Sequence, residues 1–140
     1  MPPDLKALGL TTSIENLIYG LEKLPNSPKM SFSTNINKKT RFNCDFELAL
    51  FRITQEIINN TLKHAQAKNF QIDLIGTKKE ITLNTIDNGI GFKTEKYEQR
   101  KGIGLTNLVN KIKFLNGTFS IQSYPKEGTS IAITIPIKKK

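Results

Sequence analysis

The chain has 140 residues, of which 37% are hydrophobic and 24% charged, a balance typical of one globular domain and not of a disordered segment. No apolar run approaches the roughly 20 residues of a membrane-spanning helix, and nothing resembles a signal peptide. The single cysteine, Cys44, excludes an intramolecular disulfide, and no Cys/His cluster suggests a metal site. These features predict a cytoplasmic domain in a reducing compartment.

The formal net charge of +9 is the one unusual bulk value. Such a charge suits a nucleic-acid surface, a membrane surface or a site for a polyanionic small molecule. The basic residues are scattered and not interleaved with aromatic residues, which is typical of a solvated surface, so we expect no nucleic-acid partner. The short groups among them are Lys38, Lys39 and Arg41; Lys78 and Lys79; Arg100 and Lys101; and Lys138–Lys140.

The sequence pattern of residues 1–24 predicts a short helix that is preceded by an entry segment. Thr12 and Glu15 have the spacing of a capping box, and apolar residues then recur at helical spacing. Pro25 and Pro28 end this helix. The domain division that follows has a first segment at 1–24, a linker at 25–30, a main domain at 31–137 and a basic tail at 138–140.

The main domain alternates between helical and strand-like periodicity. The stretch 93–101, "KTEKYEQRK", is polar and lacks a periodic apolar set, so it predicts a mobile loop. The expected elements are a strand in "KMSFSTNI", a helix from Glu47 to about Ala65, a hairpin of 69–76 and 80–87, a helix from Leu105 to Leu115, and a hairpin in 118–137. This order predicts an α+β fold, a two-layer α/β sandwich with about three helices on one face of a mixed, mostly antiparallel five-stranded sheet.

The long helix carries a concentrated polar face. Its spacing places Glu56, Asn60, Lys63 and His64 on one side, and Leu48, Phe51, Ile58, Leu62 and Ala65 on the other. A carboxylate, an amide and a cation one turn apart are the groups needed to hold a hydrated magnesium ion with its phosphates. Mg²⁺ keeps several waters, so the amide oxygen of Asn60 suffices as a direct protein ligand. A solvated helix face, with His64 in a structural role, remains the alternative.

A second cluster begins at "NTIDNGIGF", residues 84–92. Asp87 ends a predicted strand, and its carboxylate can accept a hydrogen bond from an exocyclic amine, which favours adenine over guanine. Gly89 and Gly91 allow close approach to a flat base, while Gly102 and Gly104 let the next helix begin near a phosphate. An ordinary Asp-Asn-Gly turn and a loop hinge are the alternatives.

These motifs in this order resemble the ATP-binding catalytic domain of a sensor histidine kinase. The resemblance covers residues 43 to 136 and rests on "FRITQEIINNTLKHA", "DNGIGF", "GIGL" and "EGTSIAITIP". The wider ATPase superfamily includes gyrase, the mismatch-repair ATPases and a chaperone. The resemblance implies a Bergerat-type ATP-binding fold of the short-lid subgroup.

The resemblance also implies roles for individual residues. Asn60 would bind Mg²⁺, Glu56 would polarise the attacking group or a metal-bound water, and Asp87 would bind the adenine amino group. Thr129 would reach the base through water. The remaining nucleotide-binding positions that it implies are Lys63 and His64 beside the phosphates, and Gly89, Gly91, Gly102, Gly104 and Leu105 in the pocket floor and lid hinges.

The implied reaction is transfer of the γ-phosphoryl group of ATP, with Mg²⁺, to a histidine outside this chain. The implied partners are the dimerisation and phosphoacceptor histidine domain of a homodimeric parent kinase and a response regulator receiver domain. The opening "PPDLKALGL" resembles the second helix of such a dimerisation domain, and the one histidine, His64, lies in the expected ATP site. We therefore expect a fragment that binds ATP and autophosphorylates little by itself. Whether the parent is anchored to a membrane stays open.

Three other readings stay open. A sister ATPase switch or a serine kinase acting on a regulatory protein would share the pocket. A nucleotide-binding module without turnover is disfavoured by the presence of both Glu56 and Asn60. A basic nucleic-acid binder predicts salt-dependent DNA affinity that ATP does not change.

Overall fold

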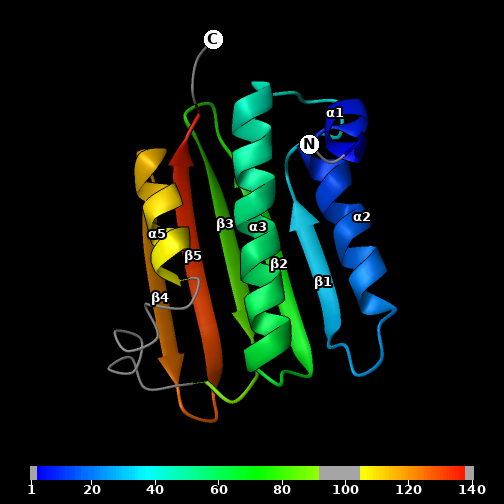
Figure 1. Cartoon of the computed structure of the whole chain (residues 1–140), viewed down its shortest axis with the longest axis vertical. Coiled ribbons are helices and arrows are strands. Elements are labelled where there is room, and N and C mark those ends of the chain that lie inside the picture. Colours follow the sequence, from blue (N-terminus) through cyan, green and yellow to red (C-terminus); the bar gives the residue numbers. More distant parts are fainter. Residues whose placement is uncertain (1–2, 92–104, 138–140) are drawn as a thin grey trace.

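Five strands form one mixed sheet in the order β1-β2-β3-β5-β4 in the computed structural model, which describes residues 3–91 and 105–137 (Figure 1). The described helices lie on one face of this sheet (Figure 1). The strands are β1 (Lys29–Thr34), β2 (Asn69–Gly76), β3 (Glu80–Asp87), β4 (Thr118–Tyr124) and β5 (Gly128–Pro136). The helices are α1 (Pro3–Leu8), α2 (Leu10–Glu22), α3 (Cys44–His64) and α5 (Leu105–Phe114). The predicted two-layer α+β sandwich is confirmed.

The sheet contains one parallel pair and three antiparallel pairs. β1 runs parallel to β2, which requires a crossover connection, and α3 supplies it. β2 with β3 and β4 with β5 form the two predicted hairpins, and β3 pairs antiparallel with β5. This topology places the C-terminal ends of β3 and α3 at the same end of the molecule (Figure 1).

The N-terminal residues form two helices where one was predicted. Gly9 separates α1 from α2 with a φ of 87°, and its N–H donates to the carbonyl oxygen of Leu5 at 3.0 Å. α2 begins at Leu10, and its N-cap residue Gly9 provides no side-chain hydrogen bond. The predicted capping box of Thr12 and Glu15 is therefore wrong, because Thr12 already lies inside the helix.

Both N-terminal helices belong to the same hydrophobic core as α3 and the sheet. Leu5 and Ile14 are fully buried, and Leu10 is 1% exposed. β1 begins at Lys29, inside the stretch predicted as a linker. The assignment of residues 1–24 to a dimerisation helix stays a prediction, but their buried side chains pack within this domain.

α3 begins three residues earlier than predicted. Asn43 caps it, because its side-chain oxygen accepts a hydrogen bond from the Asp45 N–H at 2.9 Å. The helix therefore runs from Cys44, and its acidic first turn, with Asp45 and Glu47, complements the helix dipole.

The face of α3 that meets the core differs from the predicted one. Phe51 and Ile58 are buried as predicted, but Leu48, Leu62 and Ala65 are only partly buried. The most buried positions also include Leu50, Ile53 and Ile57. α3 lies over the middle of the sheet between α2 and α5 (Figure 1). The sheet and both helices therefore cover a broader part of its surface than a single apolar stripe.

An ion pair between the exposed Arg41 and the buried Glu47 connects the N-terminal end of α3 to α1. The Arg41 guanidinium donates to both carboxylate oxygens of Glu47, at 3.2 and 3.0 Å, and Glu47 is only 1% exposed. The same guanidinium donates to the carbonyl oxygen of Lys6, while the Phe42 N–H donates to Glu47. Hydrogen bonding to Glu47 and its negative charge raise the pKa of Arg41, so the guanidinium keeps its charge.

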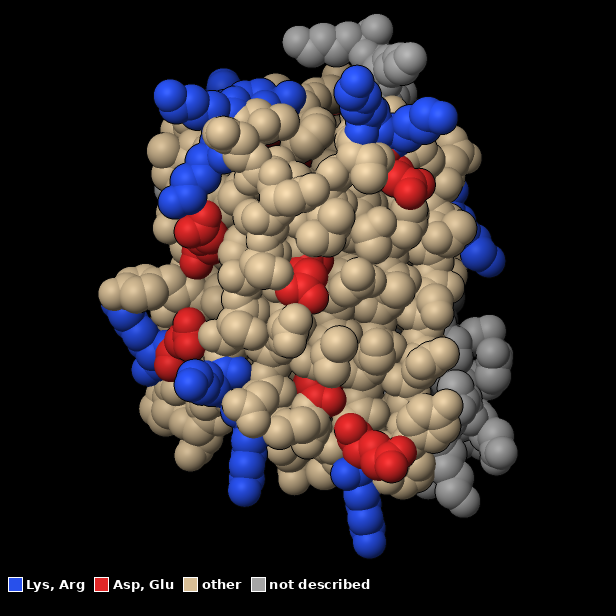
Figure 2. All heavy atoms as spheres, turned by 180° about the vertical axis from the view of Figure 1, so that it is seen from behind, with Lys and Arg blue, Asp and Glu red and all other residues tan. Residues whose placement is uncertain are grey.

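The other face of the sheet carries no described helix. Figure 2 shows that uncharged residues occupy most of this face, while lysine and arginine side chains gather toward its two ends. The outward side chains include Gln71 and Asp73, which are hydrogen-bonded to each other at 3.0 Å. None of the described helices is long and apolar enough to cross a membrane.

Candidate functional site

The candidate site lies where the C-terminal end of α3 meets the loop after β3. The Ile90 N–H donates to the carbonyl oxygen of Ala65, the residue that caps α3, at 2.7 Å. The Lys126 N–H, in the turn between β4 and β5, donates to the carbonyl oxygen of Ile90 at 2.6 Å. These two bonds bring the helix motif, the "DNGIG" loop and the final hairpin together.

Asp87 is the last residue of β3 and is 6% exposed. Its Oδ1 accepts a hydrogen bond from the Gly89 N–H at 2.8 Å, and its carboxylate also accepts one from the Thr129 N–H. Burial raises the pKa of the Asp87 carboxyl above its usual range, although both backbone hydrogen bonds oppose this shift. A buried carboxylate held by backbone donors is the fixed acceptor that selective recognition of an amine requires.

Thr129 lies directly opposite Asp87 in the β3–β5 register. Its Oγ1 is 2.8 Å from the Oγ of Ser123, which is 1% exposed. The Ser123 hydroxyl also donates to the carbonyl oxygen of Gly128 at 3.2 Å. The predicted water-mediated contact of Thr129 with a base would therefore use a hydroxyl whose direction Ser123 constrains.

Gly89 is required by a close approach between the loop and α3. A Cβ atom at this position would lie 2.0 Å from the backbone oxygen of Ala65. Gly91 lies beside the final hairpin, where its own Cβ would lie 2.0 Å from the backbone oxygen of Tyr124. Both predicted pocket glycines therefore hold the loop against neighbouring backbone.

Glu56 lies on α3 and forms an ion pair with α5. The Nζ of Lys111 donates to its Oε1 at 2.7 Å. The other carboxylate oxygen, Oε2, is buried and has no hydrogen-bond partner among the described residues. The sequence interpretation did not identify Lys111, because the two residues are 55 positions apart and only the packing of α5 on α3 brings them together.

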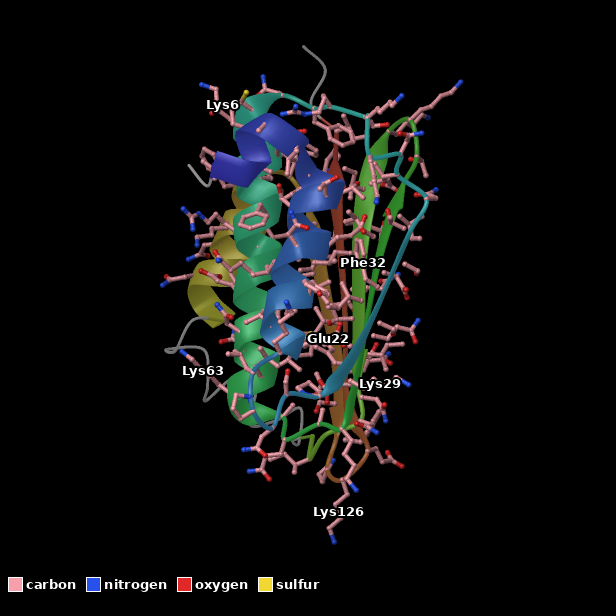
Figure 3. All side chains as sticks on the ribbon, turned by 90° about the vertical axis from the view of Figure 1, so that its right-hand side faces the viewer. Lys6, Glu22, Lys29, Phe32, Lys63 and Lys126 are labelled. Atoms are coloured by element: carbon pink, nitrogen blue, oxygen red, sulfur yellow. The ribbon has the colours of Figure 1, made fainter. Side chains whose placement is uncertain are left out.

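Asn60 and Lys63 follow Glu56 along α3. Asn60 is half-buried, and Lys63 is exposed and points away from the sheet (Figure 3). The described residues contain no group of three or more His, Cys, Asp or Glu side chains that could hold a metal. An Mg²⁺ ion held here would therefore take its ligands mainly from phosphate and water, with the Asn60 amide oxygen as a protein ligand, and this donor set fits magnesium.

Several predicted positions lie outside the described residues. Gly102, Gly104 and the predicted loop at 93–101 are among them. The backbone of His64 ends α3 and that of Leu105 begins α5, but their side chains are not described. Their predicted roles stay predictions.

Gly128 was not identified from the sequence, although it lies against Asp87. It has a φ of 99°, and a Cβ atom there would lie 2.0 Å from the backbone oxygen of Asp87. We expect Gly128→Ala to lower the free energy of unfolding by about 2–4 kcal/mol, because the substitution combines a strained φ with a backbone clash.

Gly20→Ala is the matched control for Gly128→Ala. Gly20 lies inside α2, and a Cβ atom there meets nothing within 4 Å. Its replacement should raise the free energy of unfolding by about 0.5–1 kcal/mol. Urea denaturation measures the free energy of unfolding of both variants. Equal values would show that the close contact between Gly128 and the backbone of Asp87 does not require glycine.

The sequence matches the family described as "Histidine kinase-, DNA gyrase B-, and HSP90-like ATPase" over residues 45–139. Two similar relatives are both named "Signal transduction histidine-protein kinase/phosphatase DegS". The protein of Bacillus subtilis (strain 168) is 32% identical over 97% of this chain, and that of Brevibacillus brevis is 39% identical over 74%. The matches cover 36% and 26% of those relatives, so the chain spans about a third of their length or less.

A solved structure shares the fold. The histidine kinase domain of the blue-light activated histidine kinase from Erythrobacter litoralis EL346 superposes with a TM-score of 0.69 at 14% identity. The superposition covers 90% of this chain and 58% of that one. The family match, the relatives and the shared architecture agree, and the chain belongs to the histidine kinase-, DNA gyrase B- and HSP90-like ATPase family.

Proposed function

We propose that this chain is the ATP- and Mg²⁺-binding catalytic domain of a two-component sensor histidine kinase. The observation that carries the proposal is the meeting of two motifs at one end of the molecule. The α3 face with Glu56 and Asn60 and the buried carboxylate of Asp87 are joined there by the Ile90–Ala65 hydrogen bond. The similarity to the two DegS kinases supports the same proposal.

In this proposal Asp87 accepts a hydrogen bond from the adenine amino group, and Thr129 contacts the base through water. Asn60 contributes an oxygen ligand to Mg²⁺, which would neutralise phosphate charge when bound. Lys63 and His64 lie beside the phosphates. The glycines at 89, 91, 102 and 104, with Leu105, shape the pocket and its lid.

The proposed reaction forms a bond between an imidazole nitrogen of the acceptor histidine and Pγ. The bond from Pγ to the β,γ-bridging oxygen breaks, and ADP leaves with that electron pair. The N–H proton of the imidazole is released to a base, the role we assign to Glu56. Positioning and charge neutralisation supply most of the acceleration in such transfers.

The acceptor histidine and the partners lie outside this chain in the proposal. We propose that a dimerisation and phosphoacceptor domain of a homodimeric parent supplies the histidine, and that a response regulator receiver domain accepts the phosphoryl group. Residues 1–24 would continue from that dimerisation domain, and residues 31–137 would form the catalytic domain. We place the domain in the cytoplasm, where ATP is available.

Titration calorimetry of the chain with ATP and with GTP, each with and without Mg²⁺, tests the proposal. We expect micromolar to sub-millimolar affinity for ATP and much weaker binding of GTP. Failure to bind either nucleotide would refute the proposal. DNA binding that weakens steeply with salt and ignores ATP would favour the nucleic-acid reading instead. A sister ATPase or serine kinase would bind ATP equally well, and would differ by phosphorylating a serine or water in place of a histidine.

A further inference from the structure

The ion pair between Lys111 and Glu56 connects the two helices that flank the proposed site. Nζ of Lys111 lies 2.7 Å from Oε1 of Glu56, a short charge-assisted hydrogen bond. The two side chains are 49% and 35% exposed. Exposed ion pairs contribute little to stability, so this contact adds little to the packing energy of α5 on α3.

The two oxygens of the Glu56 carboxylate have different surroundings. Oε1 is held by Lys111, whereas Oε2 is inaccessible to solvent and has no hydrogen-bond partner among the described residues. A buried acceptor without a donor carries a desolvation cost that a bound donor would relieve. The carboxylate therefore has one oxygen that Lys111 holds and one, shielded from solvent, that lacks a donor among the described residues.

We infer that Lys111 is a positioning residue for Glu56, holding Oε1 so that Oε2 faces the reacting group. This inference rests on the proposed function, in which Glu56 accepts the proton. A carboxylate without this anchor rotates freely about its last side-chain torsion, and a general base must be within hydrogen-bond reach of the proton that it takes. Lys111 thus acts through Glu56 and not on the nucleotide.

Slow hydrolysis of ATP by the chain itself provides the assay, since it needs no acceptor domain. A water oxygen forms a bond to Pγ while the bond from Pγ to the β,γ-bridging oxygen breaks and ADP leaves. The water gives its proton to Oε2 of Glu56. Single-turnover measurements with radiolabelled ATP, combined with calorimetric ATP affinities, separate turnover from binding.

Lys113 offers a matched control on the same helical turn. It is exposed, forms no ion pair with any described residue, and borders a cavity of about 480 Å³ together with Val109 and Ile121. Lys113→Met removes the same charge from the same helix as Lys111→Met. It therefore controls for net charge and for the helicity of α5.

We expect Lys111→Met to slow hydrolysis about 10- to 100-fold with ATP affinity within about twofold, as misplacement of a catalytic group does. Lys113→Met should leave both quantities within about twofold, and Lys111→Arg should recover hydrolysis to within about threefold, because arginine also binds carboxylates. In a Glu56→Gln background, Lys111→Met should cause no further loss, since residues that act as a unit are not additive.

Three results would overturn the inference. Equal hydrolysis by the Lys111→Met and Lys113→Met variants, with Glu56→Gln impaired, would reject the role of Lys111 and leave the proposed function intact. ATP affinity reduced more than about tenfold in Lys111→Met would show that Lys111 binds the nucleotide itself. A wild-type chain that binds ATP without hydrolysing it would show that Glu56 does not take a proton from water, and would overturn the inference as well. A wild-type chain that does not bind ATP would, by contrast, refute the proposed function.

Discussion

Replacement of Asp87 by asparagine is expected to weaken ATP binding about 10- to 100-fold, the effect of losing a hydrogen bond to a charged, buried acceptor. The Gly89 and Thr129 N–H groups donate hydrogen bonds to the Asp87 carboxylate in the wild-type protein. The carboxamide oxygen of the introduced asparagine can still accept these hydrogen bonds. The new NH₂ group then faces the adenine amino group, and two donors repel. Titration calorimetry with ATP measures the loss.

The same substitution should not destabilise the protein at neutral pH. Burial raises the pKa of Asp87 in the folded state, so the folded state binds the proton more tightly than the unfolded state. The stability that this adds is complete below the usual aspartate pKa of about 3.9 and is lost as the pH rises through the raised folded value. From pH 4 to pH 7 the free energy of unfolding of the wild-type protein should therefore fall relative to that of Asp87→Asn.

Asp73→Asn is the control for both measurements. Asp73 alternates with the buried Ile72 and Leu74 along β2, so it lies on the sheet face that no described helix covers, and it should not affect ATP affinity. Urea denaturation at the two pH values gives the stability difference. Wild-type ATP affinity in Asp87→Asn would exclude this carboxylate from nucleotide recognition.

Replacement of Glu56 by glutamine should reduce turnover about 100- to 10,000-fold, the range for a general base. ATP affinity should stay within about threefold of the wild-type value, because glutamine has nearly the same shape and Asp87 is unchanged. Glutamine keeps an oxygen for Lys111 but cannot accept a proton. The observable is single-turnover hydrolysis, or phosphorylation of an added acceptor domain.

Glu80→Gln controls for the loss of one negative charge in the Glu56 experiment. Glu80 is exposed at the start of β3, at the opposite end of that strand from Asp87. It should change neither binding nor turnover. Equal turnover in the Glu56→Gln and Glu80→Gln variants would remove Glu56 from the chemistry.

The sequence predicted those parts of the fold that depend on local periodicity. Both hairpins and the long helix follow from alternation and from the absence of glycine and proline, and each is present, although α3 begins three residues earlier than predicted. The errors fall where one residue overrides a pattern. Gly9 divides the N-terminal helix, and the Asn43 side chain extends α3 by capping it earlier.

The candidate site shows a similar division. Asp87 was identifiable because it ends an alternating run beside glycines, and the structure places it at the end of β3. Lys111, Ser123 and Gly128 contact site residues only through tertiary packing. Nothing local distinguishes Lys111 from Lys113, so their different surroundings could not be predicted from the sequence.

The two backbone hydrogen bonds of Ile90 also have a consequence for local unfolding. Its N–H closes the last turn of α3, and its carbonyl oxygen holds the turn between β4 and β5. The end of the helix, the loop and the turn can then open to solvent only as one cooperative unit. The amide protons of Ile90 and Lys126 should exchange with deuterated water at a common rate, which makes the assembly of this corner measurable before any nucleotide is added.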